Sequence, residues 1–547
     1  MPQTGAQCFA EALAELGVEV AFGLPGVHNL PIWESLGLAG IRLVGVRHEQ
    51  AAGYAADGYA RASGKLGVAL VTTGPGAANT IGAVGEAMAS GSPVLIVATD
   101  IPSSLHRPGV VRGVLHESRD QRALFAPVTK AAYTVPSPDE IASVMLDAGR
   151  TAMVAQSGPV YVGIPADFLH QEAGRAPEQG RTELIPAVDT MAVERARGML
   201  SGAARPLIWA GGGALRSGAG AVLGKLAERL AAPVVTTFAA RGLLPPEHPC
   251  LAADPVHVPE VGELWDEADV VLGVGTDFDG LMTQNWRMPQ PPAMIAVNVN
   301  AADAAKNYRP DITLVGDALA VTEDLLTRLA PRPGLDRLRN RLDRIEHRVR
   351  RRVRAEEPQA AELLSALRET LPEGAVLIAD MCVAGYWIGG FHRVAAPRKL
   401  AYPMGWGTLG FAFPAALGAA AAGAGRAVCV CGDGGFLYAC AELATLVQEG
   451  LPVTTIIVDD GGYGMLRYDQ EKAGLPARGV DLVTPDFVGL ARSFGVRADR
   501  VEGFGRAFRR RLREFSHADE PTVLVVQARL RPPLNTSPRW YRADRGR

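Results

Sequence analysis

The stretch VCVCGDGGFLYACAEL, residues 428–443, joins two different patterns through a glycine-rich turn. The residues before the turn, 427–431, are apolar and rich in Val and Cys, which is typical of a strand buried on both faces. The residues after the turn favour one helix that carries Leu443 and Leu446 on the same side. A strand, a glycine turn and a helix in this order predict part of a parallel sheet, where the start of the helix can hold an anion.

Composition limits the partners that the chain can have. Of its 547 residues, 48% are hydrophobic and 21% are charged, and the formal net charge is −3. The length predicts about three to four domains. The charge balance gives no reason to expect nucleic acid or a membrane surface as a partner, and no run reaches the roughly 18 uninterrupted apolar residues of a membrane span, so small molecules are expected. The sequence has no signal-peptide pattern and its six cysteines form no CxxC pair, so reduced thiols and a cytoplasmic location are expected.

Strand-like and helix-like segments alternate along three stretches of the chain. The stretches are residues 1–168, 189–330 and 361–530, and each is typical of a doubly wound parallel sheet. The sequence therefore predicts an α/β protein with three domains. Residues 170–188 have the composition of a linker, and residues 335–353 predict an amphipathic helix whose arginines face solvent. The glycines at 211–213 lack a following GxxG fingerprint, so this turn is interpreted as a plain loop.

Two aspartates follow strands of the third stretch. Asp433 comes after the strand of the opening segment, and Asp460 comes after the strand PVTTIIV. Because the carboxyl ends of parallel strands meet at one edge of a sheet, both side chains are expected at the same crevice. Carboxylate oxygens suit Mg²⁺ that also takes phosphate oxygens, and the neighbouring glycines free backbone atoms for coordination. The turn is therefore predicted to hold an anion through a metal.

Four further blocks, together with this turn, resemble a known family. The blocks are FGLPGVHNLPIWESL, RHEQAAGYAADGYAR, TTGPGAANTIGAVGEA and GWGTLGFAFPAALGAA, and the GDG turn is followed by VDDGGYG. They resemble the thiamine diphosphate enzymes that act on 2-oxo acids, and among these the acetolactate synthase large subunit. The resemblance covers nearly the whole chain. It implies a pyrimidine-binding domain at 1–168, a central domain at 189–330 and a diphosphate-binding domain at 361–530, in a homodimer or homotetramer with active sites at the subunit interface.

The resemblance also implies where thiamine diphosphate and Mg²⁺ bind. Asp433, Asp460 and the backbone carbonyl of Gly462 would ligate the metal, and Gly434 and Gly435 would donate N–H groups to the diphosphate. Position 460 is usually asparagine in the family, so the carboxylate here adds a negative charge beside the diphosphate. The other residues expected on this side of the cofactor are Gly432, Tyr463 and Gly464.

Glu49 matches the glutamate that contacts the aminopyrimidine ring in the family. Its carboxyl group would favour the imino tautomer, which takes the proton from C2 of the thiazolium. Taken without the surrounding blocks, Glu49 could instead be a carboxylate that interacts with the dipole of its helix. Leu409 matches the residue over which the cofactor folds, although it could also be a core leucine, and the carbonyl of Gly407 would hold the amino group. The residues expected to line the pyrimidine side are Pro25, Gly26, Thr72, Pro75 and Asn79.

The candidate acid–base groups on the substrate side are His28, His116 and Glu117. Thr72 stands where some 2-oxo-acid decarboxylases carry a histidine, and the adjacent histidine pair of others is missing from SSLHRP. Both absences favour carboligation. The predicted reaction is an acetolactate-synthase-like condensation, in which a 2-oxo acid such as pyruvate loses CO₂ and the resulting enamine is ligated to a second carbonyl. The alternatives are a 2-oxo-acid decarboxylase, an FAD-linked oxidase and a non-catalytic regulatory or binding homologue, of which Glu49 argues against the last.

FAD is not favoured as a cofactor. Acetolactate synthases usually carry an RFDDR-like stretch and a loop rich in Gly and His near bound FAD. The corresponding segments here are GTDFDGLMTQNW and DPVHVPEVGELW, which lack the arginine.

Overall fold

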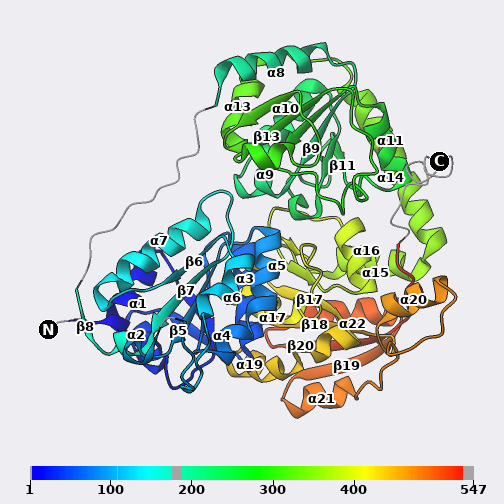
Figure 1. Ribbon diagram of the computed structural model, residues 1–547. Coiled ribbons are helices and arrows are strands. Elements are labelled where there is room, and N and C mark those ends of the chain that lie inside the picture. The colour runs from blue at the N-terminus through cyan, green and yellow to red at the C-terminus, as the bar shows by residue number, and fades with distance from the viewer. Residues whose placement is uncertain (1–2, 108, 175–187, 534–547) are drawn as a thin grey trace. The chain divides into compact units, whose positions relative to one another are not determined.

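The computed structural model describes residues 3–107, 109–174 and 188–533. The chain divides into two compact units (Figure 1). The first comprises residues 1–183, 370–385 and 401–529, and the second comprises residues 184–369, 386–400 and 530–547. The first unit contains two six-stranded sheets and the second contains one. The prediction of three α/β domains with parallel sheets is confirmed, whereas the domain limits stay a prediction. Residues 175–187 of the predicted linker lie outside the described residues.

The N-terminal sheet has the strand order β3-β2-β4-β5-β7-β6, with parallel pairing throughout. Its strands are β2 Val20–Gly23, β3 Arg42–Gly45, β4 Gly67–Val71, β5 Val94–Asp100, β6 Ala131–Thr134 and β7 Val160–Pro165. The helices around it are α1 Gly5–Glu15, α2 Leu30–Leu38, α3 Glu49–Ser63, α4 Pro75–Ala78, α5 Ile81–Ser90, α6 Gln121–Phe125 and α7 Ile141–Met153. A short antiparallel pair, β1 Gln3–Thr4 with β8 Glu172–Ala173, lies beside it.

Strand β4 shows why this sheet is covered on both faces. Val68 and Leu70 belong to the core formed with α1 and α7, whereas Ala69 and Val71 belong to the core formed with α3 and α5. Successive side chains of a strand point to opposite faces, so a continuous apolar run requires helices on both sides.

The third sheet has the order β16-β15-β17-β18-β20-β19. Its strands are β15 Val376–Ala379, β16 Leu400–Ala401, β17 Ala427–Gly432, β18 Val453–Asp459, β19 Arg497–Glu502 and β20 Thr522–Gln527. Its helices are α17 Ala412–Ala421, α18 Asp433–Leu437, α19 Leu443–Gln448, α20 Gly464–Lys472, α21 Phe487–Ser493 and α22 Arg506–Ser516. Helices α15 Pro358–Thr370 and α16 Val383–Phe391 precede β15 and β16.

The prediction of a single helix after the GDG turn is wrong. Two helices, α18 and α19, are separated by a 3-10 turn at Cys440–Glu442. The turn places the buried Glu442 where its Oε1 accepts the N–H groups of Arg47 and His48, at 2.9 and 3.1 Å. These bonds join segments that are far apart in the sequence, so the local helical pattern could not reveal them. Leu443 and Leu446 do share one buried face, as expected.

Helices α3 and α17 join the two sheets of the first unit through small residues. A side chain at Gly58 would lie 2.0 Å from Ala415 O, and one at Gly418 would lie 1.8 Å from Ala55 O. Only glycine allows this approach of two backbones. The contact encloses Arg61, whose guanidinium pairs with Asp57, at 2.6 Å, and with Glu86, at 3.2 Å.

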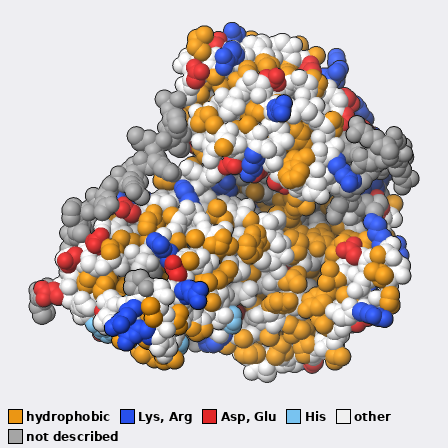
Figure 2. Space-filling model, viewed as in Figure 1, with side chains coloured by type: hydrophobic (Ala, Val, Ile, Leu, Met, Phe, Trp, Pro, Cys, Tyr) orange, Lys and Arg blue, Asp and Glu red, His pale blue; other side chains and the backbone are white. Residues whose placement is uncertain are grey.

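The central sheet of the second unit has the order β11-β10-β9-β12-β13-β14, all parallel. Its strands are β9 Pro206–Ala210, β10 Val234–Thr236, β11 Leu251–Ala252, β12 Val270–Val274, β13 Met294–Asn298 and β14 Ile312–Val315. Its helices are α8 Thr190–Gly202, α9 Gly212–Arg216, α10 Gly220–Leu230, α11 Pro259–Glu267, α12 Ala301–Ala305, α13 Ala318–Arg328 and α14 Leu335–Glu356. Figure 2 shows acidic and basic side chains interspersed on the visible face. Within the described ranges, no helix is both long and apolar enough to span a bilayer.

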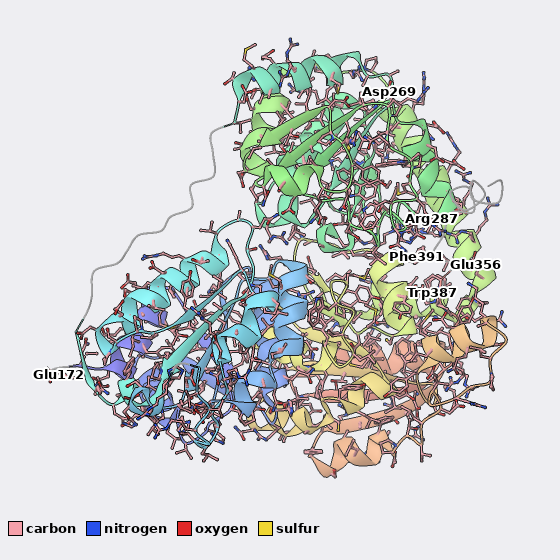
Figure 3. The ribbon with its side chains drawn as sticks, in the orientation of Figure 1. Glu172, Asp269, Arg287, Glu356, Trp387 and Phe391 are labelled. Atoms are coloured by element: carbon pink, nitrogen blue, oxygen red, sulfur yellow. The ribbon has the colours of Figure 1, made fainter. Side chains whose placement is uncertain are left out.

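The arginines of α14 do not all face solvent, which corrects the interpretation of that helix. Arg341, Arg348 and Arg352 pair with Glu267, Glu263 and Glu260 of α11, at 2.8, 2.8 and 3.1 Å. Arg352 also pairs with Glu356 at 3.1 Å, close to the end of the helix (Figure 3). Arginines of this pattern therefore join α14 to α11 within the second unit.

The glycines at 211–213 have a structural explanation. A side chain at Gly211 would lie 2.3 Å from Gly275 O, and one at Gly213 would lie 2.8 Å from Gly275 Cα. The turn after β9 thus lies against the turn after β12, which requires small residues on both sides.

Candidate active site

Glu49 begins helix α3 and is surrounded by three other residues of the predicted pyrimidine side. The His48 side chain accepts the N–H of Gln50 and so caps the helix start. Glu49 is only 9% exposed, and its Oε2 accepts a hydrogen bond from Asn79 Nδ2 at 3.0 Å. A side chain at Gly76 would lie 3.4 Å from Glu49 Oε1 and 2.8 Å from Thr72 Cγ2. The structure therefore brings Glu49, Thr72 and Asn79 together, with Pro75 at the first position of α4.

Gly26 completes this group from the loop after β2. A side chain at Gly26 would lie 2.6 Å from Thr72 Oγ1, so the two loops touch. Gly26 N donates to Asn29 Oδ1 at 2.8 Å, which holds the turn that begins at Pro25. Thr72 Oγ1 is buried and has no hydrogen-bond partner. Buried polar atoms are normally bonded, so this hydroxyl is available to a bound molecule.

Two histidines face each other beside the same loops. The rings of His28 and His116 have centroids 5.5 Å apart in an edge-on arrangement. His28 Nδ1 lies 2.8 Å from Thr73 Oγ1, and the Thr73 hydroxyl donates onward to Thr99 Oγ1 at 3.0 Å. Burial and, secondarily, His116 lower the pKa of His28 below its usual value. His116 adopts a φ of 67°, and its Nδ1 is buried without a partner.

Glu117 points its carboxylate at its own loop. Its Oε2 accepts the N–H groups of Arg112, Gly113 and Val114, at 2.8, 2.8 and 3.0 Å. Partial burial opposes ionisation, but these three bonds together hold the pKa of Glu117 below its usual value. This arrangement stabilises the loop that carries His116, and a role of Glu117 toward substrate stays a prediction.

Gln121 is a residue that the sequence did not single out. It is 2% exposed, its Oε1 accepts the N–H of Gly74 at 2.6 Å, and its Nε2 donates to Thr99 O at 2.9 Å and to the Tyr161 hydroxyl at 2.7 Å. It thereby fixes the loop between Thr73 and Gly76 against the end of β5. Gln121 begins a short helix, and nothing in the local sequence predicts that its side chain is buried.

Asp433 and Asp460 occupy the ends of the neighbouring strands β17 and β18, as predicted. Asp433 is 1% exposed; its Oδ1 accepts Gly434 N at 2.7 Å and its Oδ2 accepts Gly462 N at 2.8 Å. Asp460 Oδ1 is buried and has no hydrogen-bond partner. Burial and the charge of Asp460 raise the pKa of Asp433 to about 6. Burial likewise raises the pKa of Asp460, against the opposing effect of Arg467 and Arg529.

This pair of carboxylates can hold a cation. Both carboxylates are largely buried and have raised pKa values, one oxygen has no hydrogen-bond partner, and the ion pair at the site joins Arg467 to Asp460 at 3.8 Å. Among the residues that the structure describes, no group of three or more His, Cys, Asp or Glu side chains is placed to bind a metal. A cation here would therefore take its remaining ligands from backbone carbonyls or from a bound molecule.

Glycines around the Asp433–Asp460 pair allow the backbone to approach neighbouring residues closely. Gly462 has a φ of 149°, and a side chain there would lie 2.0 Å from Val480 O. A side chain at Gly434 would lie 2.7 Å from the ring of Tyr463, and one at Gly464 would lie 2.1 Å from Asp460 Oδ2. The structure thus brings together the predicted residues of the two turns, Gly432, Asp433, Gly434, Gly435, Asp460, Gly462, Tyr463 and Gly464.

Leu409 lies in a loop that a buried carboxylate holds. Asp380 accepts the N–H groups of Gly410 and Phe411, at 3.1 and 3.3 Å, and burial raises its pKa to about 6. Gly407 has a φ of 69°, which favours glycine. Leu409 is only half-buried and does not belong to the hydrophobic cores of the described residues. Its exposure favours a role at the surface of a site over that of a core leucine.

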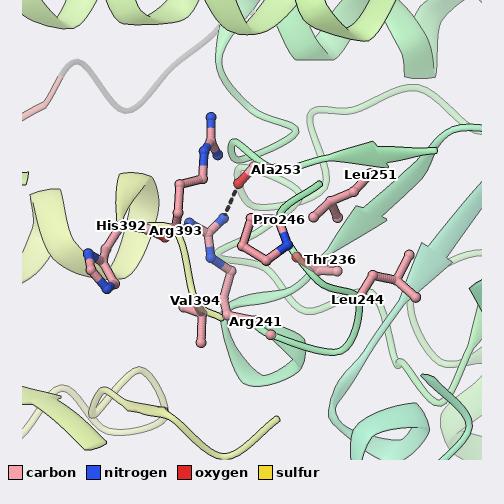
Figure 4. A pocket seen from close by; sticks show the side chains of 10 residues that line it. Thr236, Arg241, Leu244, Pro246, Leu251, Ala253, His392, Arg393 and Val394 are labelled. Carbon is pink, nitrogen blue, oxygen red and sulfur yellow. Dashed lines mark hydrogen bonds between the residues drawn. The ribbon is translucent and has the colours of Figure 1, made fainter. Parts of the chain in front are cut away.

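A separate small recess lies within the second unit (Figure 4). Arg241 lines it and donates to the carbonyls of Ala253, Gly390 and His392, at 2.5, 2.7 and 2.9 Å. Arg393, which also lines the recess, pairs with Asp254 at 3.1 Å and with Glu346 at 3.0 Å. These bonds connect chain segments through both guanidinium groups, and Arg393 Nη1 is buried without a hydrogen-bond partner.

Comparisons with known proteins agree with this arrangement. Residues 3–124 match the N-terminal TPP binding domain of thiamine pyrophosphate enzymes, residues 193–325 match the central domain, and residues 380–526 match the C-terminal TPP binding domain. The chain is 35% identical to a probable 2-ketoarginine decarboxylase of Pseudomonas aeruginosa, over 90% of this chain and 88% of that protein. It is 32% identical to a probable acetolactate synthase large subunit of Methanocaldococcus jannaschii, over 95% of this chain and 91% of that protein.

A solved structure shows the same fold. The thiamine diphosphate-dependent 4-hydroxybenzoylformate decarboxylase of Rhodococcus jostii RHA1 superposes with a TM-score of 0.82 at 24% identity, covering 97% of this chain and 100% of that one. The matched domains contain both parts of the site, with Glu49 in the first and the Asp433–Asp460 pair in the last. The chain therefore belongs to the thiamine pyrophosphate enzyme family.

Proposed function

We propose that this protein is a thiamine diphosphate- and Mg²⁺-dependent enzyme that decarboxylates a 2-oxo acid and releases the product as an aldehyde. Release of an aldehyde is favoured over ligation by one observation. The imidazole rings of His28 and His116 lie 5.5 Å apart, beside the loops that surround Glu49. Such a pair can deliver a proton to the reacting carbon after CO₂ has left, which ends the reaction before a second carbonyl is joined.

Glu49 is proposed to act on the cofactor. Thiamine diphosphate, when bound, supplies a carbon nucleophile and accepts the electrons that decarboxylation releases. Asn79 holds Oε2 of Glu49 at 3.0 Å, which fixes the direction of the carboxyl group. Glu49 can therefore exchange a proton at its other oxygen with a ring nitrogen placed against it. The unbonded hydroxyl of Thr72 offers a further polar contact on the same side.

His28 is proposed to relay protons at Nε2. The Thr73 hydroxyl donates to Thr99, so it accepts from His28 Nδ1–H, and this leaves Nε2 as the exchanging nitrogen. Because the pKa of His28 lies below its usual value, the ring is neutral at neutral pH and can accept a proton and pass it on. Gln121 keeps the loop of Thr73 in place through its bond to Gly74 N.

The cation is proposed to sit at the ends of β17 and β18. Asp433, the unbonded Oδ1 of Asp460 and the carbonyl of Gly462 would hold Mg²⁺, and the N–H groups of Gly434 and Gly435 would receive the diphosphate. Neutralisation by a cation would offset the burial of both carboxylates. Glu49 and Asp433 lie in different matched domains, and together with the family resemblance this supports the further proposal of a homodimer or homotetramer with active sites shared between subunits. The six free cysteines support a cytoplasmic location as a proposal.

A second candidate is acetolactate formation from two molecules of pyruvate. It is supported by the 32% identity to an acetolactate synthase large subunit and by Thr72, which replaces the histidine of some decarboxylases. The two candidates share the decarboxylation step and differ in whether the product is protonated or ligated.

A product screen separates the candidates. The purified protein would be given thiamine diphosphate, Mg²⁺ and a panel of 2-oxo acids that includes pyruvate, branched, aromatic and 5-guanidino members. We expect CO₂ and one aldehyde in equal amounts from one class of substrate, and neither from the Glu49→Gln variant. Acetolactate as the main product from pyruvate would favour the second candidate, and no CO₂ from any substrate would contradict both.

A further inference from the structure

We infer that Arg467 is a positioning residue that balances charge at the cation site, so that the site accepts the diphosphate as well as the metal. This rests on the cation site of the proposed function. Arg467 lies in α20, just after the glycine turn, and its Nη1 is 3.8 Å from Asp460 Oδ2. Both side chains are mostly buried, with 18% and 14% exposed, so solvent screens this pair less than a surface pair.

Arg467 is held rigidly in that position. Its Nη2 donates to Gly461 O at 3.0 Å, and its Nε donates to Asp481 Oδ1 at 2.8 Å. The Arg467 N–H also bonds Tyr463 O at 3.0 Å, which places the residue on the first turn of the helix. The guanidinium therefore contacts the turn that carries Gly462 without being a ligand itself.

The charges around the pair show why a fixed cation matters. Asp433, Asp460 and the buried Asp459 are acidic, while Arg467 and Arg529 are the basic groups that act on Asp460. Arg529 bonds the backbone oxygen of Asp460, at 3.3 Å, whereas Arg467 faces the carboxylate. Two carboxylates attract a divalent cation, but they repel the phosphate oxygens that must share it. A guanidinium beside Asp460 reduces that repulsion.

A role in charge balance and a purely structural role predict different changes in the affinities for the metal and for the diphosphate. If Arg467 balances charge, Arg467→Gln leaves the site more negative, so the metal alone binds more tightly and the diphosphate binds more weakly. If Arg467 only holds the turn, its loss loosens the ligands and weakens both. A single charge at this distance, at an effective dielectric near 20, changes an equilibrium by about tenfold or more.

The experiment measures the two affinities separately on the full chain. Mn²⁺ replaces Mg²⁺, and its binding without thiamine diphosphate is followed by electron paramagnetic resonance; thiamine diphosphate is then titrated at saturating Mn²⁺ by tryptophan fluorescence. For Arg467→Gln we expect Mn²⁺ affinity to rise about tenfold and thiamine diphosphate affinity to fall about tenfold. Arg467→Lys keeps the charge, so its affinities for Mn²⁺ and for thiamine diphosphate should both stay close to those of the parent protein.

Three comparison variants make the result specific. In an Asp460→Asn background, Arg467→Gln should have a much smaller effect, because the charge that Arg467 faces is gone. Asp481→Asn removes the charge of the other ion-pair partner of Arg467, and because the Asp481 side chain is 65% exposed, this variant should leave both affinities within about twofold. Arg500→Gln, which breaks an exposed pair with Asp486, should also change neither.

Two results would overturn the inference and can be told apart. Parallel weakening of both affinities in Arg467→Gln, reproduced by Asp481→Asn, would show that Arg467 only supports the turn, and the cation site would stand. No Mn²⁺ binding by the parent protein, with or without thiamine diphosphate, would refute the cation site and the inference with it.

Discussion

Asn79 Nδ2 donates to Glu49 Oε2 at 3.0 Å, which joins the end of helix α4 to the start of helix α3, thirty positions away in the sequence. This bond orients one oxygen of a buried carboxylate and leaves the other facing Gly76, where a side chain would be only 3.4 Å away. The surroundings of this oxygen thus depend on the lack of a side chain at Gly76. A carboxyl group used for proton exchange requires this combination of burial, orientation and open space.

Glu49→Gln should leave thiamine diphosphate binding measurable and slow the exchange of its C2 proton about a hundredfold or more, because an amide cannot relay a proton. Proton exchange at C2, followed by NMR with the bound cofactor, is the measurement. Asn79→Asp would be informative as a second variant: it removes the donor to Glu49 Oε2 but leaves the Glu49 carboxyl group able to relay a proton, so it should slow exchange less. An unchanged exchange rate in Glu49→Gln would contradict the assignment.

Leu409→Ala should lower turnover more than stability. Leu409 is half-buried and lies outside the hydrophobic cores of the described residues, so its truncation leaves only a small cavity. Leu417, in α17, is fully buried at 0% exposure and provides the matched control, because its truncation should cost about 2–5 kcal/mol. Turnover per folded molecule and the free energy of unfolding would be compared for both variants. Normal turnover with a large loss of stability in Leu409→Ala would identify a core leucine.

His257 should make the second unit less stable in acid. Burial, and secondarily Arg352, lower the pKa of His257 from 6.5 to about 4. Between these pH values the unfolded chain binds more protons than the folded one, so stability falls as the pH drops below 6.5. The full difference is on the order of 3 kcal/mol. In His257→Phe, the free energy of unfolding measured with urea should change less between pH 7 and pH 5 than in the parent protein. An unchanged pH dependence would show that other groups cause the loss of stability in acid.

FAD should bind weakly or not at all. The segment that lacks the arginine expected for FAD binding carries Asp277, which pairs with Lys306 at 2.7 Å, and Phe278, which is 1% exposed. The ring of Phe278 lies 5.2 Å from Trp209 and 5.7 Å from Tyr308, so aromatic side chains fill this region. Flavin absorbance of the purified protein after dialysis is the test. A stoichiometric signal would contradict the prediction.

Local patterns determined much of the fold and part of the site. Apolar runs and the alternation of strands and helices predicted three parallel sheets, because each pattern depends on neighbours within a few residues. The aspartates at 433 and 460 were predicted to meet because parallel strands end at one edge. The glycines at 434 and 462 are also visible in the sequence, because a backbone that approaches neighbouring atoms this closely requires residues without a side chain.

Tertiary structure decided the rest, because hydrogen bonds between distant segments follow no period in the sequence. Gln121 and Asp380 hold the two loops of the site through buried bonds to Gly74 and Gly410, yet in the sequence they are ordinary polar residues. The break between α18 and α19 accompanies bonds from Glu442 to residues about four hundred positions away. The approach of Arg467 to Asp460 likewise depends on how α20 leaves its glycine turn, which only the folded backbone defines.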